Sequence, residues 1–313
     1  KEDKYNDETD DYYFGSIANY AENSSFSGLT IEETTPISVT GERSYNPDEK
    51  VPTNYIGGMV GYASSCTISN IDFENSMNVE LQTGTDTVIA SNVGGLVGYS
   101  LLCDIMDVNY KVAYTQYNDG RAYSSLRVTS GNANVGGLVG SAVSSRIKTI
   151  SLTENKRDTV ASALPQDSSI TPIVVNCLAR DVRTTTYFGG VVGVLNSSTV
   201  SNVENALSSI SSVANVKSVK TIIAGGIVGD VFTSTMTSVV NSANISLSNK
   251  TLNDTLENQF KLAGIVGRVR GETDISNAHN RGQVSVSGTT MTQTTGYVGG
   301  IVGEIVCGTM VAR

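Results

Sequence analysis

Residues that commonly carry out catalysis are sparse in this sequence. The only histidine is His279, within the run Ser276-Asn277-Ala278-His279-Asn280. A histidine that acts as a catalytic base needs a nucleophile and an orienting acid nearby. The corresponding positions of the repeats described below hold no histidine, so nothing recurs with it. We therefore interpret His279 as a residue of a surface turn.

A glycine-rich phrase, exemplified by Val93-Gly94-Gly95-Leu96-Val97-Gly98, has part of the composition of a phosphate-binding loop. A P-loop continues with Lys and then Ser or Thr, which contact the phosphates and the metal, and this phrase does not. Neighbouring acids such as Glu32 and Glu33 point to opposite sides of a strand. Carboxylates at matching repeat positions, which a carbohydrate-cleaving site would need, are not found. We expect no catalytic residues, no cofactor and no metal site, and predict that the chain is not an enzyme.

Two of the four cysteines occupy matching places after the glycine phrase. Cys66 follows Gly57 by nine residues, and Cys103 follows Gly94 by nine residues. If successive copies stack, the two Cα atoms lie about 4.8 Å apart, within the range of a disulfide. Other copies hold serine at this place, which is typical of a turn built from small residues. The sequence therefore predicts either a disulfide or a stacked, unbonded pair.

The glycine phrase occurs eight times, at intervals of 42, 37, 42, 53, 36, 38 and 36 residues between first-glycine positions. Such self-similarity is the signature of a repeat architecture. The intervals vary while the phrase does not, so each unit has a fixed core and loops of variable length. The first-glycine positions are Gly15, Gly57, Gly94, Gly136, Gly189, Gly225, Ala263 and Gly299.

Short β-branched runs broken by Gly, Asn, Asp and Ser follow each copy, a pattern typical of strands and turns. We predict an all-β fold, namely a right-handed parallel β-solenoid (β-helix) of about eight irregular coils, each with about three strands. A β-propeller is the alternative, because its blades have a similar period. The lack of tryptophan and the single histidine favour the solenoid.

Strand alternation separates the phrase into two apolar stripes, as in a sheet that is covered on both faces. The stripe through Val60, Val97 and Val139 is assigned to the core. The second is a candidate interaction stripe, covered by loops of the chain or by another protein. Its members are Ile17, Met59, Leu96, Leu138, Val191, Ile227, Ile265 and Ile301.

Charge is concentrated at the start of this chain of 313 residues, whose formal net charge is −9. Residues 1–50 hold twelve acids and four bases, a net charge of −8, which leaves −1 for the remainder. A nearly neutral body argues against a nucleic-acid partner, which requires clustered Lys and Arg. No run of about twenty apolar residues predicts a membrane span. We divide the chain into an acidic lead, 1–13, and a solenoid domain, 14–313, whose last unit is incomplete.

The phrase and the segment that follows it resemble the GLUG motif. The best matches are Val93 to Gly98, Val135 to Gly140 and Val298 to Gly303, with Ile68-Ser69-Asn70-Ile71 as a second strand. The motif occurs in large bacterial surface proteins, in adhesin-like repeat proteins and in the non-catalytic stretch of immunoglobulin A1-cleaving metallopeptidases. Two departures are units longer than the usual family repeat and the near absence of its Tyr-Ala-Thr-Gly ending.

This resemblance implies an extracellular or cell-surface location and a non-catalytic structural or adhesive role, including that of a building block of a surface filament. Two alternatives are a β-helix that binds or degrades carbohydrate polymers and the scaffold region of a larger surface protease. The expected partners are other protein chains, among them further copies of this chain joined through open solenoid ends or the apolar stripe, and glycans.

Overall fold

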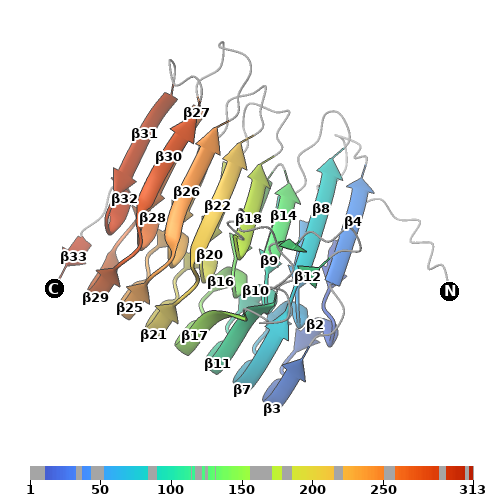
Figure 1. Ribbon diagram of the computed structural model, residues 1–313. Helices are drawn as coiled ribbons and strands as arrows, with labels where there is room; N and C mark the ends of the chain where they lie inside the picture. The colour runs from blue at the N-terminus through green and yellow to red at the C-terminus, as the bar shows by residue number, and fades with distance from the viewer. Residues whose placement is uncertain are drawn as a thin grey trace, which may run out of the picture.

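The computed structural model shows an all-β parallel β-solenoid, which confirms the predicted fold class (Figure 1). Coils run from the blue N-terminal side to the red C-terminal side, and each strand pairs with its counterpart in the next coil. The propeller alternative is wrong, because neighbouring copies of the phrase join the same sheets. The structure describes residues 11–32, 37–43, 53–83, 90–113, 115–116, 122–123, 126–130, 132–155, 171–177, 185–214, 221–249, 258–288, 294–306 and 310–312.

Four parallel sheets, here named A to D in the order in which the chain visits them, enclose the core. Sheet A contains β1 (Tyr12–Phe14), β5 (Thr53–Gly57), β9 (Ala90–Gly94), β15 (Asn132–Gly136), β19 (Thr185–Gly189), β23 (Thr221–Gly225), β27 (Asn258–Ala263) and β31 (Thr294–Gly299). Sheet B contains β2 (Ala18–Glu22), β6 (Val60–Ser64), β10 (Val97–Leu101), β16 (Val139–Val143), β20 (Val192–Asn196), β24 (Val228–Phe232), β28 (Val266–Arg270) and β32 (Val302–Val306).

The other two sheets are built from the segments after the phrase. Sheet C contains β3 (Ser25–Glu32), β7 (Thr67–Asn75), β11 (Asp104–Ala113), β17 (Arg146–Asn155), β21 (Thr199–Asn205), β25 (Thr235–Asn241), β29 (Thr273–Asn280) and β33 (Met310–Ala312). Sheet D contains β4 (Ile37–Arg43), β8 (Met77–Thr83), β14 (Leu126–Ser130), β18 (Ile173–Cys177), β22 (Ser209–Ala214), β26 (Asn244–Asn249) and β30 (Val284–Gly288). A short antiparallel pair, β12 (Thr115–Gln116) and β13 (Ala122–Tyr123), lies apart from them.

Each complete coil therefore has four strands, one more than the sequence predicts. The register agrees with the predicted stacking, since Val97 pairs with Val60 on one side and with Val139 on the other. All three valines are fully buried. The first strand begins at Tyr12, inside the segment that the sequence assigns to the acidic lead, while residues 1–10 lie outside the described part of the chain.

The glycine phrase is a corner between two strands and not a single strand. Gly57 ends β5, Gly58 and Met59 form a bend, and Val60 begins β6. The bends are themselves stacked, because the Met59 N–H donates to the carbonyl of Leu96 at 2.9 Å. A residue in a bend does not follow the alternation of a strand, so Met59 and Val60 are both buried in the core.

This geometry corrects the expected interaction stripe. Its six interior members are fully buried and belong to the hydrophobic core, so they offer no surface to a partner. Only the members in the first and last copies are exposed, Ile17 by 46% and Ile301 by 37%. The buried members are Met59, Leu96, Leu138, Val191, Ile227 and Ile265.

A second repeated feature is a left-handed residue within the strands of sheet C. Asn70 and Asn202 both have φ of 53°, and Thr149 at the equivalent place has φ of 56°. Asparagine tolerates this conformation, whereas a β-branched residue is strained in it. The strand ladder skips this residue in each coil, which produces an aligned row of bulges along the sheet.

Replacing Thr149 with asparagine is expected to stabilise the protein by about 1 kcal/mol, because the exposed threonine adopts a backbone conformation that disfavours its branched Cβ. The measurement is the free energy of unfolding in guanidinium chloride. Thr199→Asn is the matched control, since Thr199 is also exposed in sheet C but has no positive φ. An equal or greater gain in the control would contradict the explanation.

Candidate functional site

The outward residues next to the glycine corner form two facing rows, which we call the A/B seam. One row lies in sheet A, two residues before the first-glycine position, and the other lies in sheet B, five residues after it. The sheet A row is Tyr13, Tyr55, Asn92, Asn134, Tyr187, Ile223, Lys261 and Tyr297. The sheet B row is Tyr20, Tyr62, Tyr99, Ser141, Val194, Asp230, Arg268 and Glu304.

Glycines allow sheets A and B to approach each other at the base of the seam. A Cβ atom on Gly98 would lie 2.6 Å from the backbone nitrogen of Ile56, and one on Gly61 would lie 2.7 Å from the carbonyl oxygen of Phe14. These distances leave no room for any side chain. The last glycine of the phrase therefore recurs because the backbones of the two sheets are in contact there.

Tyrosines fill the N-terminal part of the seam. The rings of Tyr20, Tyr62 and Tyr99 stack in sequence with centroid distances of 5.2 Å in both steps. Tyr55 meets Tyr62 edge to face across the seam, also at 5.2 Å. Loss of hydration raises the pKa of Tyr62 and Tyr99, and that of Tyr13 to about 12, so these phenols stay protonated to a higher pH than a tyrosine in water.

Polar side chains occupy the middle of the seam and bind one another. The Oδ1 atom of Asn92 accepts hydrogen bonds from Asn134 at 2.9 Å and from Ser141 at 2.6 Å. Asn92 and Ser141 are buried. The buried side-chain oxygen of Asn92 is therefore satisfied by two neighbouring side chains of the seam.

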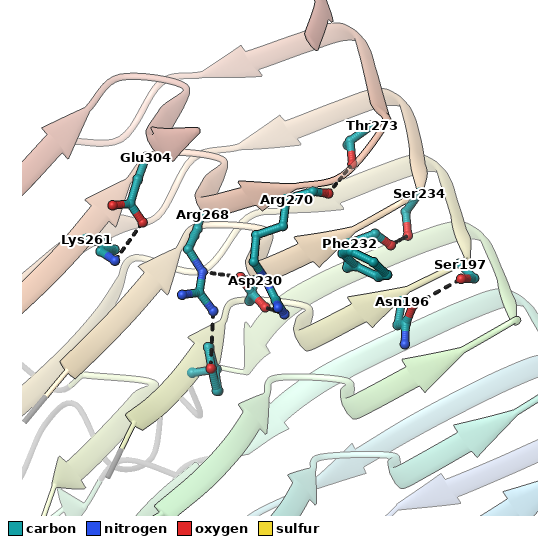
Figure 2. Close-up of polar contacts among 11 residues, drawn as sticks. Asn196, Ser197, Asp230, Phe232, Ser234, Lys261, Arg268, Arg270, Thr273 and Glu304 are labelled. Atoms are coloured by element: carbon teal, nitrogen blue, oxygen red, sulfur yellow. Dashed lines mark hydrogen bonds and ion pairs between the residues drawn. The ribbon is translucent and has the colours of Figure 1, made fainter. Parts of the chain in front are cut away.

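Ion pairs occupy the C-terminal part of the seam (Figure 2). Asp230 is 1% exposed and receives hydrogen bonds from the guanidinium groups of Arg268, at 2.6 Å, and Arg270. Arg268 also donates to the hydroxyl of Tyr187 at 3.2 Å. Lys261, in the same coil as Arg268, pairs with Glu304 of the next coil at 2.6 Å. A buried carboxylate between two arginines has a structural role. Removing one charged partner lowers the stability of the protein, because it leaves a buried charge without its counter-charge.

Asparagines at the ends of sheet C strands join consecutive coils near the second glycine of the phrase. The Asn205 side chain donates to Asn241 Oδ1 at 2.9 Å, and Asn241 donates to Asn280 Oδ1 at 2.9 Å. Asn205 also donates to the carbonyl of Gly226 at 2.8 Å, which ties the asparagine row to the corner. Asn205 and Asn241 are fully buried, so the row satisfies polar groups inside the core.

The predicted cysteine pair lies at the corner between sheets B and C. The backbone N–H of Cys66 donates to the sulfur of Cys103 at 3.4 Å, so the two residues are stacked in consecutive coils. Both are free thiols, as is the buried Cys177. The row continues with serine, because the N–H of Cys103 donates to Ser145 Oγ at 3.1 Å and that of Ser145 to Ser198 Oγ at 2.9 Å.

Replacing Cys103 with serine is expected to change the free energy of unfolding by less than about 1 kcal/mol, because a serine hydroxyl accepts the same hydrogen bond in the adjacent coils. Cys103→Ala is expected to cost about 1–3 kcal/mol, since it leaves the buried N–H of Cys66 without its acceptor. Denaturant titration compares the two variants. A serine variant as unstable as the alanine variant would contradict this role.

His279 is the remaining residue that the sequence singles out for possible chemistry. It is exposed as expected, but it lies within strand β29 and not in a turn, and its Nε2 lies 2.9 Å from Asn277 Oδ1. Among the described residues, no group of three or more His, Cys, Asp or Glu side chains could hold a metal ion. Nor does the described part of the chain include a helix with the length and hydropathy needed to cross a bilayer.

Comparison with known proteins finds no match to this chain among family models, curated proteins or solved structures. The A/B seam and the buried polar rows are therefore interpreted from their own geometry.

Proposed function

We propose that this protein is a non-catalytic structural or adhesive element of an extracellular surface, with a role as a rigid spacer or filament component. The observation that carries the proposal is the use of polar side chains inside the solenoid. The side chains of Asn205, Asn241 and Ser145 form hydrogen bonds with residues of the neighbouring coil. Such bonds add to the four strand ladders and resist separation of the coils.

Three further features support this proposal. The coils repeat one architecture, so the length of the solenoid increases with the number of units. The charged groups of the seam, centred on Asp230, are engaged in mutual ion pairs. The resemblance to the GLUG motif adds the expectation of a surface location, because that motif occurs in large surface and adhesin-like proteins. Other protein chains at the same surface are the partners that such a component would have.

The location can be tested with antibodies raised against the purified chain and applied to intact cells of the source organism. We expect labelling of intact cells and its loss after brief protease treatment of the cell exterior. An antibody against a cytoplasmic protein serves as the control for leakage. Labelling that appears only after the cells are permeabilised would contradict the proposal.

The non-catalytic part of the proposal needs a separate experiment, because a surface location is also compatible with an enzyme. The purified chain is incubated with a panel of plant, fungal and bacterial polysaccharides, and newly formed reducing ends are measured. We expect no release above that of a heat-denatured sample. Release that depends on the folded protein would favour the carbohydrate-degrading alternative.

A further inference from the structure

We infer that Tyr20 and Tyr62 form an oxidative cross-linking site, at which a one-electron oxidant joins two neighbouring coils through a dityrosine bond. The two residues pair directly in sheet B. Their rings are stacked with a centroid distance of 5.2 Å and an interplanar angle of 2°. No other pair of stacked tyrosines in the described part of the chain combines such alignment with an exposed member.

Tyr20 is the place where oxidation would begin. The residue is 50% exposed, so an oxidant in solution can reach it. Its hydroxyl donates a hydrogen bond to Glu22 Oε2 at 3.4 Å. When the phenol loses an electron, its proton becomes strongly acidic and the Glu22 carboxylate is placed to accept it. Tyr20 therefore combines access for an oxidant with a nearby group that can accept its proton.

Tyr62 is the partner because it touches more of the cluster than any other ring. It stacks on Tyr20 and on Tyr99, and it meets Tyr13 and Tyr55 edge to face. A radical formed on any of these neighbours is therefore in ring contact with Tyr62. Tyr20 and Tyr62 are register partners in sheet B, so the two rings lie side by side on neighbouring strands. The Tyr20 ring also meets Tyr13 edge to face at 5.8 Å, and it must tilt from its stacked position for a bond to Tyr62 to form.

The reaction balances as follows. Each phenol loses one electron to the oxidant and one proton to Glu22 or water, which gives two phenoxyl radicals. The radicals join through a new carbon–carbon bond between the ring positions next to the oxygen atoms. The hydrogen displaced from each of these carbons returns to the phenol oxygen through water. The product has lost two hydrogen atoms in total, and the oxidant, such as a haem peroxidase with hydrogen peroxide, has gained two electrons.

The test treats the purified full chain, at low protein concentration, with a haem peroxidase and hydrogen peroxide. We expect blue dityrosine fluorescence in the monomer fraction and a cross-linked peptide pair containing Tyr20 and Tyr62, with the mass lowered by two hydrogens. Tyr62→Phe keeps the stacked ring but lacks the phenol, and should reduce the monomer signal at least about fivefold. Tyr297→Phe is the matched control, because Tyr297 is 47% exposed and makes none of the ring contacts found among the described residues.

A third variant, Glu22→Gln, removes the proton acceptor and should slow the formation of the product without abolishing it. Circular dichroism and the thermal unfolding midpoint establish that each variant is folded before oxidation. Undiminished monomer fluorescence in Tyr62→Phe would overturn the inference. So would dityrosine found only in covalent dimers, or a peptide map that places the bond at Tyr297.

Discussion

Replacing Gly226 with alanine is expected to destabilise the protein by about 4 kcal/mol or more, and to reduce the yield of folded protein. The added Cβ would lie 2.1 Å from the carbonyl oxygen of Gly264 and 2.4 Å from Cγ of Asn241. The first contact is with the backbone of the next coil, and the second is with a buried side chain held by neighbouring asparagines. Neither the Gly264 carbonyl nor the Asn241 side chain can move away without breaking hydrogen bonds between coils. The measurement is the free energy of unfolding, with soluble yield as a second readout.

The last copy of the phrase provides a matched control. Gly300 occupies the same place in the phrase as Gly226, but a Cβ on Gly300 would have no atom within 4 Å. The free energy of unfolding of Gly300→Ala is therefore expected to lie within about 0.5 kcal/mol of that of the original protein. Similar losses in both variants would show that alanine is disfavoured by the bend itself and not by the neighbouring coil.

Replacing Asp230 with alanine is the other change with a large expected effect. We expect it to lower the free energy of unfolding by about 3 kcal/mol. The carboxylate is 1% exposed and pairs with both Arg268 and Arg270. Its removal leaves the Arg268 guanidinium, whose side chain is only 16% exposed, without a counter-charge. Chemical denaturation of the variant measures this cost.

An exposed ion pair in the same protein serves as the comparison for Asp230. Asp104 pairs with Arg146, whose side chain is 68% exposed, so Asp104→Ala should cost no more than about 1 kcal/mol. The double variant Asp230→Val with Arg268→Val should recover much of the loss, since the row already contains Val194 beside Asp230. Equal effects of Asp230→Ala and Asp104→Ala would contradict the role assigned to burial.

The sequence predicts the solenoid well because its core valine recurs at one place in nearly every copy of the phrase. Val60, Val97 and Val139 recur with one spacing from the glycines, and the structure stacks them as expected. The corner could not be predicted by strand alternation, because Gly58 and Met59 bend the chain and turn two successive residues inward. For the same reason the stripe that includes Met59 was expected on the other face of the sheet, covered by loops or by another protein, and instead lies in the core.

The A/B seam is harder to predict because its residues differ in type from coil to coil. Its two rows become neighbours only after the chain has bent at the glycines. One signal is present in the sequence, since Tyr13 precedes Tyr20 by seven residues and Tyr55 precedes Tyr62 by seven residues. The charged part of the seam has no such signal, because Asp230 and its arginines belong to consecutive coils and are joined only by register.

The uniform bend between sheets A and B also bears on how such a gene can change. The inner copies all place two residues between these strands, as between Gly94 and Val97 or Gly136 and Val139, while spacing varies elsewhere. Removing residues 95–136 would join Gly94 to Gly137 and restore an intact phrase. Recombination between two copies at this point would therefore add or delete one repeat unit and keep the glycine bend intact. The length of the solenoid would then change by whole coils, through the gain or loss of copies that the gene already contains.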